Sequence, residues 1–120
     1  MKILLVDDSK AIHALIRDLM SKKSYSLDEA YNGKECLAKL ESNKYDLILL
    51  DWEMPVMTGP ETFAELKKKG ISIPVVMMTS RNSMEDIDKM ITAGVAEYII
   101  KPFTEDIVFE KIGMALGATG

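Results

Sequence analysis

Short apolar runs alternate along the chain with segments in which apolar residues recur at helical spacing. Four of the runs are almost wholly apolar and are typical of buried strands, at residues 3–6, 47–50, 75–78 and 98–100. A fifth run, residues 25–31, alternates polar and apolar residues and indicates a half-exposed strand. The pattern therefore predicts five strands, each followed by a helical segment.

Apolar spacing and capping residues mark the helical segments. In the first of them the apolar residues follow the spacing of one helix face: Ile12, Leu15, Ile16, Leu19 and Met20. Ser9 precedes them as an N-cap, and Asn32 is the N-cap candidate of the second segment. Pro60 suits the first helical position of the third segment. The last two helical segments follow Ser83 and Thr104.

Strands that alternate with helices indicate a parallel sheet covered by helices on both faces. Right-handed crossovers leave few topologies for such a sheet. Asp28 and Glu29 in the second run and Glu97 in the fifth suit the sheet edges, whereas the apolar runs suit its centre. We therefore predict a flavodoxin-like (βα)5 three-layer α/β sandwich with the strand order 2-1-3-4-5, built as a single domain from residues 1–120.

Composition narrows the class of protein but assigns no activity. Apolar residues make up 48% of the chain and charged residues 28%, as in ordinary globular domains. The net charge of −4 argues against direct nucleic-acid binding, which needs clustered basic residues. The single cysteine, Cys36, indicates a reducing compartment, and the apolar run after Met1 is too short for a membrane span. We expect a cytoplasmic domain that does not contact a membrane.

Residues with candidate chemistry directly follow four of the predicted strands. Asp7 and Asp8 follow the first, Asp51 the third, Thr79 the fourth and Lys101 the fifth. Ligands of open parallel sheets bind beyond these strand ends, so we expect the five side chains to converge. Three adjacent carboxylates need a compensating cation, and an oxygen-only ligand set favours Mg²⁺, or Mn²⁺, over Zn²⁺. Together with an ammonium and a hydroxyl, they predict a receptor for a phosphoryl group, which an aspartate could accept covalently.

The segments around these residues resemble the motifs of response-regulator receiver domains of two-component signalling. The matching segments are residues 6–9 (VDDS), 51–59 (DWEMPVMTG), 78–80 (MTS) and 98–103 (YIIKPF). Trp52 after Asp51, together with Tyr98, is most similar to the single-domain chemotaxis type. The resemblance covers essentially the whole chain.

The resemblance implies how the phosphoryl group is received. Asp51 would accept it from the phosphohistidine of a sensor histidine kinase or of a phosphotransfer protein. Asp8 and Asp51 would bind Mg²⁺ directly, Asp7 would help through water, and the backbone carbonyl of Glu53 would be a further ligand.

The resemblance also implies a switch. Thr79 and Lys101 would contact the phosphoryl oxygens, and Tyr98 would swing inward as Thr79 moves toward the phosphate. The peptide bond between Lys101 and Pro102 would be cis. A downstream protein would bind the surface formed by the helix at 84–93, the fifth strand and the last helix. The domain would catalyse only its own phosphorylation and dephosphorylation and would not be an enzyme for other substrates.

Three side chains near these motifs carry separate expectations. Glu53 and Arg81 depart from the commonest pattern, and we predict that they form an ion pair across the mouth of the site and control the access of water. His13 is the single histidine and is expected on the polar surface of the first helix.

Other functions stay open at this stage. The domain could be a binding scaffold that is never phosphorylated, or a receiver excised from a larger response regulator. An aspartyl-phosphate hydrolase is disfavoured for two reasons. Such enzymes carry a second aspartate, the general acid, two residues after the nucleophile, where this chain has Glu53, and the chain is too short to build a cap that encloses the substrate. A flavin carrier is disfavoured because Asp7 and Asp8 would repel the flavin phosphate.

Overall fold

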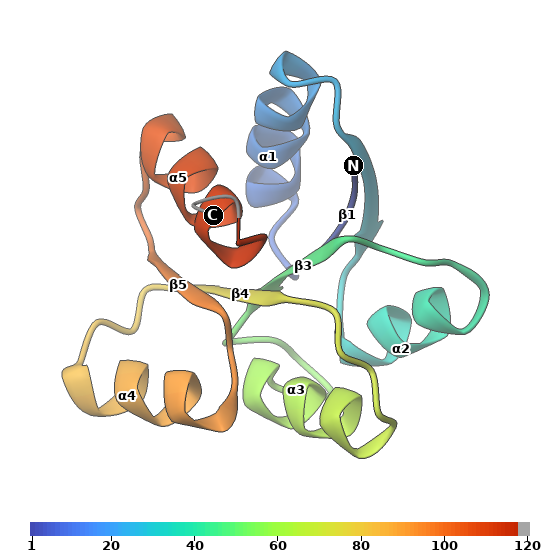
Figure 1. Ribbon diagram of the computed structural model, residues 1–120, viewed down its shortest axis with the longest axis vertical. Coiled ribbons are helices and arrows are strands. Elements are labelled where there is room, and N and C mark those ends of the chain that lie inside the picture. Colours follow the sequence, from blue (N-terminus) through green and yellow to red (C-terminus); the bar gives the residue numbers. More distant parts are fainter. Residues whose placement is uncertain (118–120) are drawn as a thin grey trace.

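In the computed structural model, which describes residues 1–117, strands and helices alternate from one end to the other (Figure 1). The strands are β1 (Lys2–Val6), β2 (Ser26–Ala30), β3 (Leu47–Asp51), β4 (Val75–Thr79) and β5 (Glu97–Ile100). The helices are α1 (Lys10–Lys22), α2 (Gly33–Ser42), α3 (Gly59–Lys68), α4 (Met84–Ala93) and α5 (Glu105–Ala115). The predicted alternation is confirmed. Residues 118–120 of the predicted domain lie outside the described residues.

The strands form one parallel sheet in the order β2-β1-β3-β4-β5, as the sequence predicts. The edge strands are β2, which carries Asp28 and Glu29, and β5, which carries Glu97, as the sequence predicts. Helices α1 and α5 cover one face of the sheet, and α2, α3 and α4 cover the other (Figure 1). Within residues 1–117, no helix has the length and apolar character that a membrane span requires.

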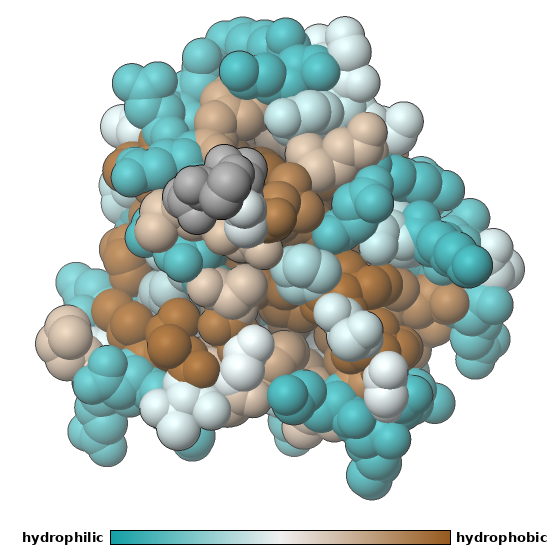
Figure 2. Space-filling model, in the orientation of Figure 1, coloured by the Kyte–Doolittle hydropathy of each residue, from teal (hydrophilic) through white to brown (hydrophobic). Residues whose placement is uncertain are grey.

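Alternate residues of each strand feed the two cores on either side of the sheet. In β1, Ile3 and Leu5 pack on the side of α1 with Ile16, whereas Leu4 and Val6 pack on the side of α2 and α3. All five of these side chains are fully buried. Polar residues cover much of the outer helical surface, and apolar residues show between the helices (Figure 2). Because both faces of the central strands are buried, their sequences are continuous apolar runs.

Side-chain caps begin the helices at or near the predicted positions. The hydroxyl or amide oxygen of the N-cap residue accepts a backbone N–H in α1, α2, α4 and α5, with the caps Ser9, Asn32, Ser83 and Thr104. Helix α3 differs from the prediction, because it begins at Gly59 and Pro60 is its second residue. Thr58 and Glu61 form a capping box there, each side chain accepting the backbone N–H of the other, and this box starts the helix one residue earlier.

Helix α1 is rotated relative to the prediction. Leu15, expected on its apolar face, is 45% exposed, and His13, expected at the surface, is fully buried. The buried stripe of the helix consists of His13, Ile16, Leu19 and Met20. The expectation for His13 is wrong because its ring makes two short polar contacts, to the backbone of Asp7 and to Glu29, which turn this side of the helix toward the sheet.

The loop from β3 to α3 passes close to the backbone of Asp51. Gly59 donates its N–H to the carbonyl of Trp52 at 2.8 Å, and a Cβ at Gly59 would lie only 2.3 Å from the carbonyl oxygen of Asp51. Glycine is therefore required where this loop packs against the end of β3.

Val56 in the same loop adopts a left-handed conformation that β-branched residues rarely adopt. Its φ is +73°, and its side chain is 69% exposed. We expect Val56→Asn to raise the free energy of unfolding by about 1 kcal/mol, because asparagine tolerates this conformation better. Urea unfolding would measure the gain. The control Val56→Thr keeps the β-branch and should bring no gain; equal stability of all three proteins would contradict the prediction.

Candidate functional site

The sheet register brings the predicted site residues to one edge. Strand β1 ends one residue before Asp7, at the level of Leu50, so Asp7 lies beside Asp51. Thr79 is the last residue of β4 and pairs with the last residue of β5, after which Lys101 follows at the same edge. The convergence that the sequence predicts follows directly from this register.

Three carboxylates and one ammonium lie together at this edge. Asp7, Asp8 and Asp51 each present an oxygen, and these oxygens lie within 4.8 Å of one another. Asp7 is fully buried and Asp51 is 4% exposed, whereas Asp8 is exposed at the rim. Lys101 Nζ donates to Asp7 Oδ2 at 2.8 Å and to Asp51 Oδ1 at 3.2 Å. The ammonium thus offsets part of the repulsion between the two buried carboxylates.

The surroundings raise the pKa of both Asp51 and Lys101. Burial, followed by the negative charge of Asp7, raises the pKa of Asp51 to about 6, although Lys101 opposes the rise. Burial alone would lower the pKa of Lys101, but its hydrogen bond to Asp7 and the charges of Asp7 and Asp51 raise it. Near neutral pH the site therefore pairs an ionised carboxylate with a charged ammonium.

The ligand set suits a hard divalent cation. All candidate ligand atoms are oxygens, which favours Mg²⁺, and receiver domains generally use this ion. Asp7 already accepts hydrogen bonds at both oxygens, from the Ser9 N–H at 2.8 Å and from Lys101 at 2.8 Å. Both oxygens of Asp7 are therefore engaged in hydrogen bonds, whereas the carboxylate of Asp8 is exposed.

The loop after β4 joins Thr79 to Tyr98. The Arg81 N–H donates to Thr79 Oγ1 at 3.1 Å, and the Tyr98 hydroxyl donates to the Arg81 carbonyl at 3.2 Å. Tyr98 is 7% exposed, so its ring is buried. The backbone of Arg81 thus connects the site hydroxyl with the aromatic residue of β5. The peptide bond between Lys101 and Pro102 is cis.

Glu53 and Arg81 form an ion pair beside the acidic cluster. Arg81 Nε donates to Glu53 Oε1 at 2.6 Å, and Arg81 Nη1 lies 3.5 Å from Asp86 Oδ2. The guanidinium also lies 4.7 Å from the ring centroid of Trp52, the residue after Asp51. The contacts with Trp52 and Asp86, which were not predicted from the sequence, hold the arginine over this edge of the site.

His13 also lies near the site, 2.7 Å from the carbonyl oxygen of Asp7, and this position was not predicted from the sequence. Its spacing to Ile16 and Met20, three and seven positions on, would have placed it on the buried stripe of α1. The prediction placed the apolar residues Ile12 and Leu15 on the buried face of α1, and this put His13 on the exposed face.

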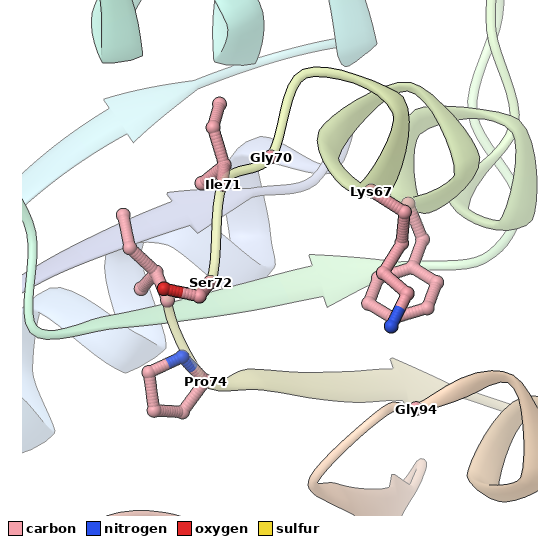
Figure 3. A pocket seen from close by; sticks show the side chains of 8 residues that line it. Lys67, Gly70, Ile71, Ser72, Pro74 and Gly94 are labelled. Atoms are coloured by element: carbon pink, nitrogen blue, oxygen red, sulfur yellow. The ribbon is translucent and has the colours of Figure 1, made fainter.

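A hollow of about 350 Å³ lies at the opposite end of the sheet (Figure 3). It lies at the amino end of β4, where Pro74 precedes the strand, and Lys67 of α3 reaches across it toward Gly94. The predicted site residues are not among those that line this hollow. The acidic cluster is therefore separate from it.

Comparison with known proteins agrees with this geometry. The family model of the response regulator receiver domain matches residues 3–113. Chemotaxis protein CheY1 of Helicobacter pylori is 34% identical over 121 residues, with 98% of both chains covered. Transcriptional regulatory protein ResD of Bacillus subtilis is 41% identical over 104 residues, which are 86% of this chain but 42% of ResD. This chain thus spans less than half the length of ResD.

Solved structures show the same fold. The receiver domain of the Francisella response regulator 1452 superposes with a TM-score of 0.91 at 29% identity, covering 99% of this chain and 98% of that one. A two-component response regulator from Clostridium difficile gives 0.90 at 30% identity, covering 100% and 98%. The chain belongs to the response regulator receiver domains of two-component signalling and is similar over its whole length to CheY-like single-domain members.

Proposed function

We propose that this domain is a phosphorelay switch that accepts a phosphoryl group on Asp51. The arrangement of Asp51 carries the proposal: it ends the central strand β3, is 4% exposed, and lies 3.2 Å from the ammonium of Lys101 in a cluster of carboxylates. The donor is a sensor histidine kinase or a phosphotransfer protein that bears a phosphohistidine, since receiver domains as a family interact with such kinases.

The transfer needs one ionised carboxylate and stabilisation of charge on the phosphoryl oxygens. A carboxylate oxygen of Asp51 forms the new O–P bond while the P–N bond of the phosphohistidine breaks, and the departing imidazole nitrogen keeps the electron pair. With a pKa of about 6, Asp51 is mostly ionised near neutral pH. Lys101 and the Thr79 hydroxyl then contact the transferred oxygens, which is the positioning and charge stabilisation that such transfers require.

The metal site is made of residues from the same edge. Asp8, Asp51 and the backbone carbonyl of Glu53 would hold Mg²⁺ directly, with Mn²⁺ as a substitute, and Asp7 would contribute through water. When bound, the ion would supply positive charge for the phosphoryl oxygens. The three carboxylate oxygens within 4.8 Å of one another support this assignment.

The response to phosphorylation passes through the loop after β4. When Thr79 turns toward the phosphate it gives up its bond to the Arg81 N–H, and Tyr98 is bonded to the carbonyl of the same residue. The surface that changes is formed by α4, β5 and α5, where Met84, Ile91 and Ile107 are exposed apolar side chains. A downstream protein binds this face.

The domain acts in the cytoplasm, contacts neither nucleic acid nor a membrane, and catalyses only its own phosphorylation and dephosphorylation. ResD is longer than this chain and is named as a transcriptional regulator, so the same phosphoacceptor chemistry could also serve a longer regulator.

The test is incubation with a small acyl phosphate and Mg²⁺, followed by intact mass measurement. We expect one added phosphate on the wild-type protein, and none on Asp51→Asn or after chelation of the metal. An unlabelled wild-type protein would instead favour a scaffold that works without phosphorylation. Steady hydrolysis of unrelated phosphate esters would favour a hydrolase.

The ion pair of Glu53 and Arg81 should control how long the phosphoryl group stays on Asp51. Both side chains are largely exposed, so the pair contributes little to stability, and its effect is on the access of water. We expect Arg81→Ala and Glu53→Ala to hydrolyse the acyl phosphate severalfold faster than wild type, measured as the decay of the labelled protein. Lys68→Ala removes the partner of Glu65, an ion pair within α3, and should not alter the decay. Unchanged lifetimes in both site variants would contradict the prediction.

A further inference from the structure

A buried histidine joins the backbone of the acidic cluster to the edge strand β2. The side chain of His13 is fully buried, and its Nε2 lies 2.7 Å from the carbonyl oxygen of Asp7. A carbonyl oxygen can only accept, so Nε2 donates to it. Nδ1 lies 2.8 Å from Glu29 Oε1, a carboxylate oxygen that also accepts, so Nδ1 is the donor of this second hydrogen bond. The ring stacks on Tyr31 with centroids 4.1 Å apart. The ring is therefore fixed by two polar contacts and one stacking contact.

The other polar groups of Asp7 are held as well. Its N–H donates to the Ala30 carbonyl at 3.1 Å, and its carboxylate accepts from the Ser9 N–H and from Lys101. The carbonyl that His13 contacts belongs to the peptide between Asp7 and Asp8. The contact thus fixes the plane of this peptide, from which the exposed Asp8 projects.

Glu29 holds the histidine ring from the opposite side. Arg17 contacts both of its carboxylate oxygens, at 2.7 Å through Nη2 and at 3.3 Å through Nε. These two bonds, together with burial of the ring, leave His13 little freedom to turn away from Asp7. A continuous chain of contacts therefore runs from Arg17 on the surface to the backbone of the acidic cluster.

We infer that His13 is a positioning residue of the magnesium site, which fixes the direction in which Asp8 presents its carboxylate to the ion. The inference rests on the proposed function only for the identity of the ion. Residues that orient a ligand through a hydrogen bond commonly change metal affinity about 10- to 100-fold when they are removed. A loss of Mg²⁺ affinity is expected here because the exposed side chain of Asp8 is oriented by the peptide between Asp7 and Asp8, which His13 holds.

Two amide substitutions separate this role from simple filling of space. In His13→Gln the amide nitrogen reaches the position of Nε2 and can donate to the Asp7 carbonyl, whereas in His13→Asn it reaches only the position of Nδ1. We expect the Kd for Mg²⁺ to rise about tenfold in His13→Asn and much less in His13→Gln. Trp52, the single tryptophan of the chain and the neighbour of Asp51, reports binding through its fluorescence.

A second readout follows the peptide itself. The amide ¹⁵N resonance of Asp8 should move in metal-free His13→Asn and return toward its wild-type position in His13→Gln. Equal Mg²⁺ affinity in both variants, whether reduced or unchanged, would overturn the inference. A wild-type protein that binds no Mg²⁺ would instead overturn the proposed metal site. If His13→Asn does not fold, His13→Leu fills the volume without a donor, and the same loss of affinity relative to His13→Gln is expected.

Discussion

Asp51→Asn is expected to abolish phosphate incorporation and yet to raise the free energy of unfolding of the metal-free protein by about 2–3 kcal/mol at pH 8. The stabilisation arises because burial of the Asp51 carboxylate and the nearby negative charge of Asp7 both disfavour the charged form that the wild-type protein carries at this pH. Its pKa is about 6 in the folded protein against an ordinary value of 3.8. Asparagine keeps the size of the side chain and carries no charge.

The pH dependence of this gain follows from the direction of the shift. The folded protein holds the Asp51 proton more tightly than the unfolded chain does. The contribution of Asp51 to stability therefore falls as the pH rises from about 4 to about 6, and the penalty is complete above that range. The advantage of Asp51→Asn should be full at pH 8 and nearly absent at pH 4.

Urea unfolding of metal-free protein at several pH values would measure this advantage. Asp18→Asn removes an exposed carboxylate of α1 and serves as the matched control, for which we expect little change at pH 8. If Asp51→Asn is no more stable than wild type at pH 8, or if it gains as much stability at pH 4, burial does not raise the pKa of Asp51 in the folded protein.

Strand order and the position of the acidic cluster could be predicted because both follow from simple periodicity. The acidic residues of β2 and β5 indicated the edges, and parallel strands that end together bring Asp7, Asp51 and Lys101 to one place. No side-chain contact had to be known for this step. The ion pair of Glu53 and Arg81 was also within reach, since each residue lies two positions after a strand end.

The rest depends on contacts that periodicity does not encode. The rotation of α1 arises because His13 bonds to a backbone carbonyl, and this polar pairing overrides the apolar signal of Leu15. The contact of Arg81 with the ring of Trp52 depends on how two loops meet. The left-handed backbone of Val56 is contrary to the preference of its own side chain, so no local rule could have predicted it.

Lys101→Met is expected to lower the free energy of unfolding of the metal-free protein by about 3 kcal/mol at pH 8, because breaking a buried ion pair leaves uncompensated charge behind. Lys101 is the ammonium partner of both Asp7, which is fully buried, and Asp51, which nearly is. Methionine retains much of the apolar stem but none of the charge. We also expect phosphate incorporation to fall sharply, since the transferred oxygens lose a cationic contact.

The matched control is Lys111→Met, which removes the ammonium from an ion pair between Lys111 of α5 and Glu97 of β5 at 3.1 Å. That pair is more exposed, so its loss should cost about 1 kcal/mol or less. Chemical unfolding of the two variants under identical conditions compares them directly. Equal losses would mean that the position of Lys101 between two buried carboxylates has no special weight.

A double-mutant cycle then tests whether Lys101 stabilises the fold through Asp51. In the Asp51→Asn background one of the two carboxylates near Lys101 is already neutral, so Lys101→Met should cost less there than in wild type. The remaining cost reports the pairing with Asp7, whose carboxylate lies 2.8 Å from the ammonium. A coupling of about 1 kcal/mol or more is expected for groups in direct contact. Strict additivity would show that the ammonium acts on Asp7 alone, and Asp51 would then have to be held in its buried position by the backbone of β3 and by the loop that packs against it at Gly59.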